Sequence, residues 1–140
     1  MNRLKISTAL VMLLALVFLG IIVFPVLWDE WLARKWEQQI RQKQNPEELR
    51  TWAKELFALY STNQFELQMQ ITNTPPKGIP VSKYGPTILL EKDNTDSGPS
   101  EHLFLIWKFI RARGLYVGET NYVSSNGKMW KPGIYFYTEP

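Results

Sequence analysis

Residues 6–28 have the sequence ISTALVMLLALVFLGIIVFPVLW, in which no residue is charged and none is histidine. As an α-helix, this stretch is long enough to cross a hydrocarbon core of about 30 Å. A helix is also the one open-ended structure that satisfies its own backbone hydrogen bonds in lipid. The sequence therefore predicts a transmembrane helix at 6–28, in contact with the lipid bilayer, after a short tail at 1–5.

A cleaved secretory signal is the alternative interpretation of this stretch. Its apolar part is longer than the roughly 7–15 residues typical of such signals, and no A-x-A-like cleavage site follows it. Trp28 and Trp31 follow instead, and tryptophan is enriched where a membrane meets water. We therefore predict a retained signal-anchor, with Trp28 and Trp31 at the membrane interface.

The charges beside the apolar stretch decide its orientation only weakly. Arg3 and Lys5 precede it, but more lysines and arginines follow it, so the positive-inside rule does not favour a cytoplasmic N-terminus. The short N-terminal tail and the acidic pair Asp29 and Glu30 at the exit resemble a signal-anchor. We predict a single-pass protein of the cell membrane whose C-terminal domain lies outside the cytoplasm.

Composition excludes several kinds of site in the rest of the chain. With no cysteine among 140 residues, disulfides, thiolate zinc sites and cysteine nucleophiles are ruled out. Arg3 and Lys5 aside, the basic residues are nearly balanced by the 13 acidic ones, so we expect no nucleic-acid partner. The densest basic cluster, Lys108, Arg111 and Arg113, fits a turn with solvated charges; a phosphate or lipid-headgroup contact is the alternative.

Two helical segments follow the apolar stretch. Residues 29–44 carry apolar positions at helical spacing among charged ones, which predicts an amphipathic stalk that continues the membrane helix. Asn45 and Pro46 then favour a new helix, with asparagine as N-cap and proline in the first helical position. This second helix is predicted to end near Tyr60 and to have one apolar face.

From residue 65 the pattern changes to strands. Apolar and polar residues alternate strictly over 65–72, and further strands are predicted at 87–91, 102–110, 115–123 and 133–138. The run at 102–110 is also compatible with a helix. A polar turn is expected at 93–100, and Asn126-Gly127 is a hairpin signal between the last two strands. The predicted fold is an α+β domain at 45–140, in which one or two helices pack on an antiparallel sheet of four or five strands.

Residues with catalytic or metal-binding chemistry are sparse. His102 is the only histidine, so an imidazole metal centre is not expected, and a surface histidine at the start of a strand is preferred over a catalytic one. The segment DNTDSG at 93–98 resembles the start of an EF-hand loop, but position 12 is Phe104 where glutamate is required. We predict no catalytic residues, cofactor or metal.

Aromatic residues are the unusual feature, at 14% of the chain, and they crowd its end. Because side chains on a strand alternate between its two faces, some of these rings are expected to point away from the core. Exposed aromatics anchor protein interfaces and also stack on sugars. Core packing is the alternative. The candidate partner surface comprises Trp107, Tyr116, Trp130, Tyr135 and Tyr137.

The outline of an apolar N-terminal helix, an amphipathic extension and an antiparallel sheet resembles that of type IV pilins and pseudopilins. The chain lacks the Gly-Phe-Thr-Leu-Ile-Glu-like processing site of those proteins and the glutamate just inside their apolar segment. The resemblance is one of architecture, and no family is assigned.

The sequence as a whole favours a non-enzymatic interaction or assembly module, acting as an accessory subunit of a membrane complex. A protein partner in the membrane is expected, with the aromatic residues as the contact. Two alternatives are an extracytoplasmic glycan- or cell-wall-binding domain and a small membrane-anchored hydrolase that uses scattered carboxylates.

Overall fold

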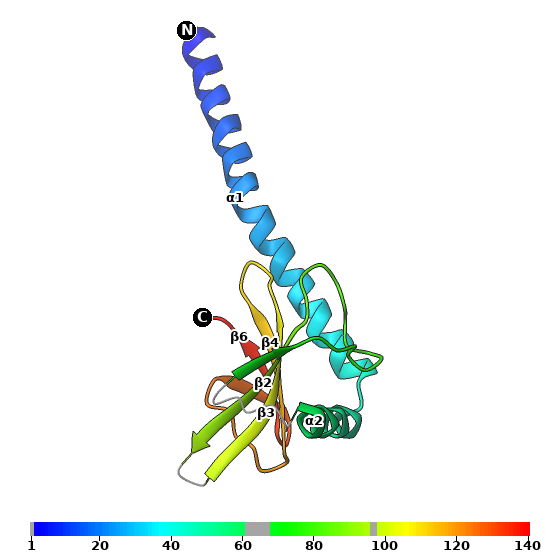
Figure 1. The fold of residues 1–140 in the computed structure, drawn as a ribbon. Coiled ribbons are helices and arrows are strands. Elements are labelled where there is room, and N and C mark those ends of the chain that lie inside the picture. Colours follow the sequence, from blue (N-terminus) through cyan, green and yellow to red (C-terminus); the bar gives the residue numbers. More distant parts are fainter. Residues whose placement is uncertain (1, 61–67, 96–97) are drawn as a thin grey trace. The chain divides into compact units, whose positions relative to one another are not determined.

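The computed structural model describes residues 2–60, 68–95 and 98–140 (Figure 1). Its contacts divide the chain after Arg34 into a first unit, Met1–Arg34, and a second unit, Lys35–Pro140. Each unit is described by itself.

A single long helix, α1 (Asn2–Lys43), makes up the described part of the first unit and continues into the second. Its apolar side chains from Leu10 to Leu27 are exposed, as expected of a segment suited to lipid. By length and composition α1 could cross a membrane, and Pro25 lies within it. The predicted helical structure over 6–28 and 29–44 is confirmed through Lys43.

The second helix, α2 (Pro46–Tyr60), starts where the sequence predicts. The side chain of Asn45 accepts a hydrogen bond from the backbone N–H of Glu47 at 2.9 Å, which is the expected N-cap. Leu49, Ala53 and Leu56 form its buried face. The residues at the start of this helix therefore predict its position correctly.

In the described residues, six strands form one antiparallel sheet in the order β1-β2-β3-β4-β6-β5. They are β1 (Gln68–Ile71), β2 (Thr87–Thr95), β3 (Gly98–Trp107), β4 (Arg113–Gly118), β5 (Gly127–Lys131) and β6 (Ile134–Thr138). The predicted α+β class is therefore confirmed. The sheet has six strands among the described residues, and the predicted number of four or five is wrong. Residues 102–107 of the apolar run are strand, which resolves the choice between strand and helix.

The additional strand, β5, comes from a wrong turn prediction. Asn126-Gly127 does not join the last two strands; β5 begins at Gly127 and pairs with β6 through a turn at Pro132-Gly133. Gly133 takes the positive φ of 77° that this turn needs. The strand predicted at 115–123 ends at Gly118, because the chain turns there and Tyr122 N–H bonds the Glu119 carbonyl at 2.9 Å.

Two further predictions concern the other end of the sheet. The polar turn expected at 93–100 is shorter, since residues 93–95 belong to β2 and 98–100 to β3. Residues 96 and 97 lie outside the described residues. The alternating strand at 65–72 is present as β1, and residues 65–67 also lie outside the described residues.

The main core lies between the sheet and the two helices. It combines Trp36 and Ile40 of α1 with the buried face of α2 and one face of the sheet. The Trp36 ring packs edge-on against Trp107 at 4.8 Å and against Phe136 at 5.7 Å. The last residues of α1 are therefore part of the hydrophobic core of the second unit.

Arg50 joins α2 to the turn between β5 and β6. Its buried guanidinium pairs with the carboxylate of Glu47 and donates a hydrogen bond to the Pro132 carbonyl. Burying a charged group costs a great deal unless it is paired and hydrogen-bonded, and here Nη1 and Nη2 have partners while the buried Nε has none among the described residues. The contact fixes the position of the β5–β6 turn relative to α2.

Candidate interaction surface

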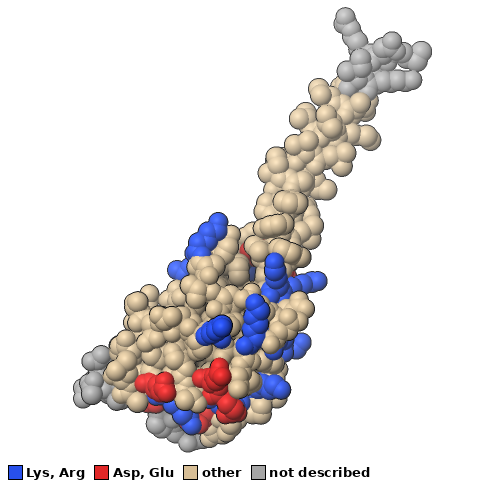
Figure 2. Space-filling view, turned by 90° about the vertical axis from the view of Figure 1, so that its right-hand side faces the viewer, with Lys and Arg blue, Asp and Glu red and all other residues tan. Residues whose placement is uncertain are grey.

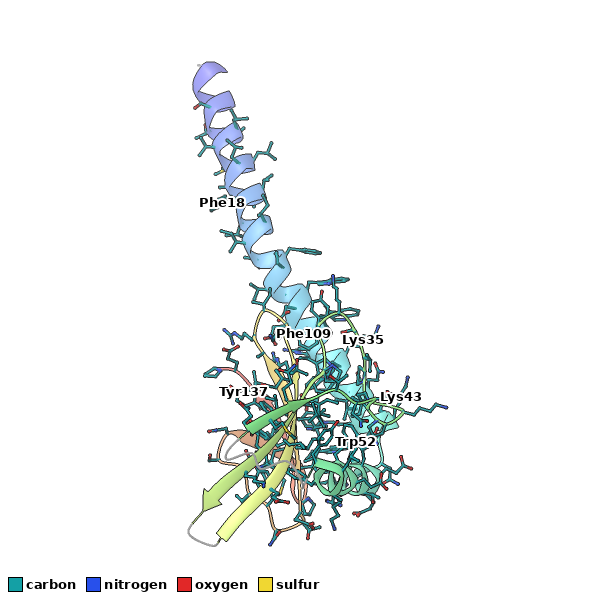
Figure 3. The ribbon with its side chains drawn as sticks, viewed as in Figure 1. Phe18, Lys35, Lys43, Trp52, Phe109 and Tyr137 are labelled. Carbon is teal, nitrogen blue, oxygen red and sulfur yellow. The ribbon has the colours of Figure 1, made fainter. Side chains whose placement is uncertain are left out.

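The sheet has a second face, opposite α2, which we call the open face. Figure 1 shows α2 on one side of the sheet and no described helix on the other, and Figure 3 shows Trp52 of α2 and Tyr137 of β6 on opposite sides. Along β3, Leu103, Leu105 and Trp107 point toward the helices. The side chains between them therefore point to the open face.

An aromatic layer covers the middle of the open face. The Phe104 ring of β3 stacks on the Tyr116 ring of β4, with centroids 4.1 Å apart and planes at 7°. Tyr137 stands edge-on to both, at 5.7 Å and 6.0 Å. Offset and edge-on contacts of this kind are favourable beyond the area they bury. The layer thus forms a second, thinner cluster of packed side chains.

Two glycines of β4 make room for these rings. A Cβ added at Gly114 would lie 2.2 Å from Cε2 of Phe104, and one added at Gly118 would lie 2.6 Å from Cγ of Tyr122. Both distances are far inside van der Waals contact. The side chains of Phe104 and Tyr122 can therefore lie flat across β4 only because these positions have no side chain.

Polar side chains cross β1, β2 and β3 at one end of the layer. Glu91 accepts a hydrogen bond from Gln68 Nε2 at 2.6 Å through one oxygen, and its other oxygen lies 2.8 Å from His102 Nε2. The His102 ring stacks on Tyr122 at 4.5 Å. The histidine is 1% exposed, so the prediction of a surface histidine is wrong. Pairing with Glu91 and cover from Tyr122 make its burial possible.

The accessible part of the open face has an apolar region with one phenol beside a polar edge, where Gln68 and Gln70 of β1 are exposed opposite Glu91 and Leu89. Leu89, Ile106 and Tyr137 are partly exposed where they pack on the aromatic layer. Met129 of β5 lies opposite Tyr135, hence on the same face, and is 59% exposed. A surface of aliphatic, methionine and tyrosine side chains is typical of the centre of a protein interface.

The five residues of the predicted partner surface divide between core and surface. Trp107 is fully buried in the main core, where its Nε1 donates to the Pro80 carbonyl at 2.9 Å. Tyr116 and Tyr135 are buried in the aromatic layer. Neighbouring rings and strands therefore cover most of these three side chains. Trp130 and Tyr137 are partly exposed, but Trp130 packs on the main core and Tyr137 on the open face.

The two predicted membrane-interface residues lie in the first unit. Trp28 and Trp31 are about half exposed, and their rings lie 5.1 Å apart on α1. Phe24 stacks on Trp28 one turn earlier, at 6.1 Å. Three neighbouring aromatic rings therefore mark the end of the apolar segment.

Among the residues that the structure describes, no group of three or more histidine, cysteine, aspartate or glutamate side chains could hold a metal ion. The backbone of the EF-hand-like segment is extended from 93 to 95, paired with 98–100, and this is strand geometry.

Sequence reasoning missed the Glu91–His102 pair and the glycine positions. The signal for the pair was one ionisable residue in each of two apolar strands, but the register of the strands was needed to bring the two residues together. The spacing of Gly114 and Gly118, four residues apart in one strand, places both on one face. Comparisons with protein-family models, curated proteins and solved structures found no match.

Proposed function

We propose that this chain is a non-enzymatic interaction or assembly module, held in the cell membrane by residues 6–28 and acting as an accessory subunit of a membrane complex. The open face of its sheet is the proposed contact with a protein partner in the same membrane. Anchoring both proteins in one bilayer raises their effective concentration, so that a modest surface suffices for association.

The observation that carries this proposal is the exposed apolar part of the open face. Leu89, Ile106, Tyr137 and Met129 lie on strands whose other face is already packed against helices. The rigid aromatic layer beneath them holds these side chains in place at little conformational cost. Such pre-organised apolar surfaces are favoured binding sites for proteins.

Two other functions receive less support from the same geometry. A glycan platform needs exposed coplanar rings, whereas the coplanar pair Phe104 and Tyr116 is buried. A hydrolase that used the only histidine would need substrate to reach His102, whose ring lies beneath Tyr122. These observations favour an interaction role over a glycan platform and over catalysis by His102.

The proposed orientation places the second unit outside the cytoplasm. Protease added to intact cells or spheroplasts tests this orientation. We expect the second unit to be digested only when the protease has access to the extracytoplasmic side, and digestion only from the cytoplasmic side would reverse the assignment.

Site-specific photocrosslinking tests the proposed contact. A photoreactive amino acid replaces Ile106, Tyr137 or Met129 on the open face, and Val123 or Leu59 as exposed apolar controls elsewhere. We expect irradiation in intact membranes to link the open-face positions to one integral membrane protein, with the controls unlinked. Equal labelling at all positions, or none at the open face, would contradict the proposal.

A further inference from the structure

Two loops of the second unit pack together beside Trp36. The first is residues 81–84 and the second is residues 108–111, and we call them the loop pair. The backbone N–H of Lys108 donates to the Tyr84 carbonyl at 2.7 Å, and the Tyr84 and Phe109 rings lie 5.2 Å apart. Phe109 in turn meets the Trp36 ring edge-on at 6.3 Å. In Figure 3, Phe109 and Lys35 lie at the same end of the second unit.

The exposed side chains of the loop pair combine two kinds of chemistry. Val81 and Ile110 are apolar yet 69% and 63% exposed. Lys83, Lys108 and Arg111 are exposed beside them, and the sequences VSKY and KFIR contain no acidic residue. Figure 2 shows that most acidic side chains on one face of the second unit lie at one end, whereas basic side chains are spread from that end to the other.

One acidic group lies close to this region. The Glu139 carboxylate accepts a hydrogen bond from the backbone N–H of Ala112 at 2.9 Å. Arg113 points to another partner, since its Nη1 donates to Thr138 Oγ1 at 2.7 Å. The charge of the loop pair itself therefore remains positive, and it comes from Lys83, Lys108 and Arg111.

The chain ties the loop pair to the end of the apolar segment. Only residues 29–35 lie between Trp28 and Trp36, so chain length alone keeps these tryptophans within about 30 Å, whatever the orientation of the two units. Basic residues near a membrane are attracted to anionic lipids, and apolar side chains beside them enter the acyl boundary.

We propose that the loop pair binds the headgroups of anionic phospholipids in the leaflet where the apolar segment of α1 ends. The amino and guanidinium groups of Lys83, Lys108 and Arg111 bind phosphate oxygens, while Val81 and Ile110 enter the boundary between headgroups and acyl chains. This contact restricts the orientation of the second unit at the membrane. The inference rests on the proposed anchoring by residues 6–28.

The absence of native cysteine allows a direct test with the full chain, since single cysteines at 81, 110 and 123 can each carry an environment-sensitive fluorophore. Val123 is the control, an exposed valine on another loop. The labelled protein is placed in nanodiscs of phosphatidylcholine alone or mixed with phosphatidylglycerol. We expect labels at 81 and 110 to shift to the blue in the anionic discs and to be quenched by headgroup-attached nitroxide, with no change at 123.

Variants with fewer basic residues distinguish binding to lipid headgroups from burial of the labels by another contact. Lys108→Gln with Arg111→Gln is expected to lower the docked-to-undocked ratio by roughly tenfold or more, from about 1 kcal/mol per basic residue near an anionic surface. Lys128→Gln with Lys131→Gln on β5 is the matched control and should leave quenching unchanged. Equal quenching of the labels at 81, 110 and 123 would overturn the proposal. Quenching at 81 and 110 that stays the same when Lys108 and Arg111 are both replaced by glutamine would also overturn it.

A fourth label, at Phe18→Cys, reports on the anchor in the same discs. Quenching of this label by nitroxide deep in the acyl chains shows that the apolar segment is inserted. If position 18 is quenched but 81 and 110 are not, the loop-pair proposal is wrong and the anchor stands. If position 18 is not quenched, the anchoring itself is wrong. A further outcome is that the labels at 81 and 110 become buried only in native membranes and are not quenched by nitroxide lipid. That result would indicate a contact with a protein and would overturn the lipid assignment.

Discussion

At the scale of single residues, the open face depends on positions where a side chain is absent. Gly114 and Gly118 allow Phe104 and Tyr122 to lie across β4, and the stacked rings then bury one another. A surface that would otherwise consist of separate exposed aromatics becomes a continuous layer. The identity of these two glycines therefore determines which rings are buried and which apolar side chains are left accessible.

Gly114→Ala is expected to destabilise the second unit by about 1–3 kcal/mol, because the new methyl group overlaps the Phe104 ring and forces it to move. Urea unfolding of the full chain in detergent, followed by tryptophan fluorescence, measures this change. Combining it with Phe104→Leu should recover part of the loss, since the smaller side chain frees the space. An unchanged stability of Gly114→Ala would show that the ring does not lie over β4.

Glu91→Ala is expected to cost about 1–3 kcal/mol, because it leaves the buried His102 without the carboxylate that lies 2.8 Å from its Nε2. Glu91→Gln retains the shape and part of the hydrogen bonding and should cost less. The same unfolding measurement compares the two. Equal stability of Glu91→Ala and the unaltered chain would rule out a stabilising pair.

At the scale of secondary-structure elements, the helices could be predicted and part of the sheet could not. Asn45 and Pro46 sit beside the helix they start, so the signal for α2 is local. β5 has no such signal: it is an edge strand with most side chains exposed, and its sequence GKMWK lacks apolar alternation. Its pairing depends on contacts distant in sequence, which no local pattern contains.

The candidate site was predicted only in outline for a related reason. On β3, Leu103, Phe104 and Leu105 are all apolar, so the sequence indicates apolar side chains on both faces of the strand but not which face the helices cover. Trp107 was assigned to the surface although it lies on the helix side of the sheet. Deciding between the two faces required the register of the strands and the position of Trp36.

Asn45→Ala tests the local signal for α2. Loss of the side-chain oxygen that caps the Glu47 N–H is expected to lower stability by about 1 kcal/mol. Asn45→Asp and Asn45→Ser, which keep an acceptor, should remain close to the unaltered chain in thermal unfolding. A loss of the same size in all three variants would indicate that the cap bond is not responsible.

Arg50→Ala tests the link between α2 and the β5–β6 turn. Removing the guanidinium that bonds Glu47 and the Pro132 carbonyl is expected to cost about 1–3 kcal/mol and to increase hydrogen exchange in β5. Lys54→Ala is the matched control on the same helix. Its exposed ion pair with Glu119, at 3.3 Å, should contribute under about 1 kcal/mol. Similar effects of the two changes would contradict a specific role for Arg50.

At the scale of the whole molecule, an apolar helix precedes a small sheet that keeps one face accessible. The first unit supplies exposed hydrocarbon side chains over the length of a bilayer core. The second supplies a packed core, and we propose that its open face binds a protein partner and that its loop pair binds lipid headgroups. Each of these roles depends on residues 6–28 remaining part of the protein and in the membrane.

The most direct test is the intact mass of the protein recovered from membranes washed at alkaline pH. We predict that the chain stays with the washed membranes, is released only by detergent and has a mass that includes residues 6–28. Release of the full chain by the wash would contradict insertion in the bilayer. A lower mass, equal to that of a chain beginning after the apolar stretch, would show that the stretch is a cleaved signal and would contradict the anchor.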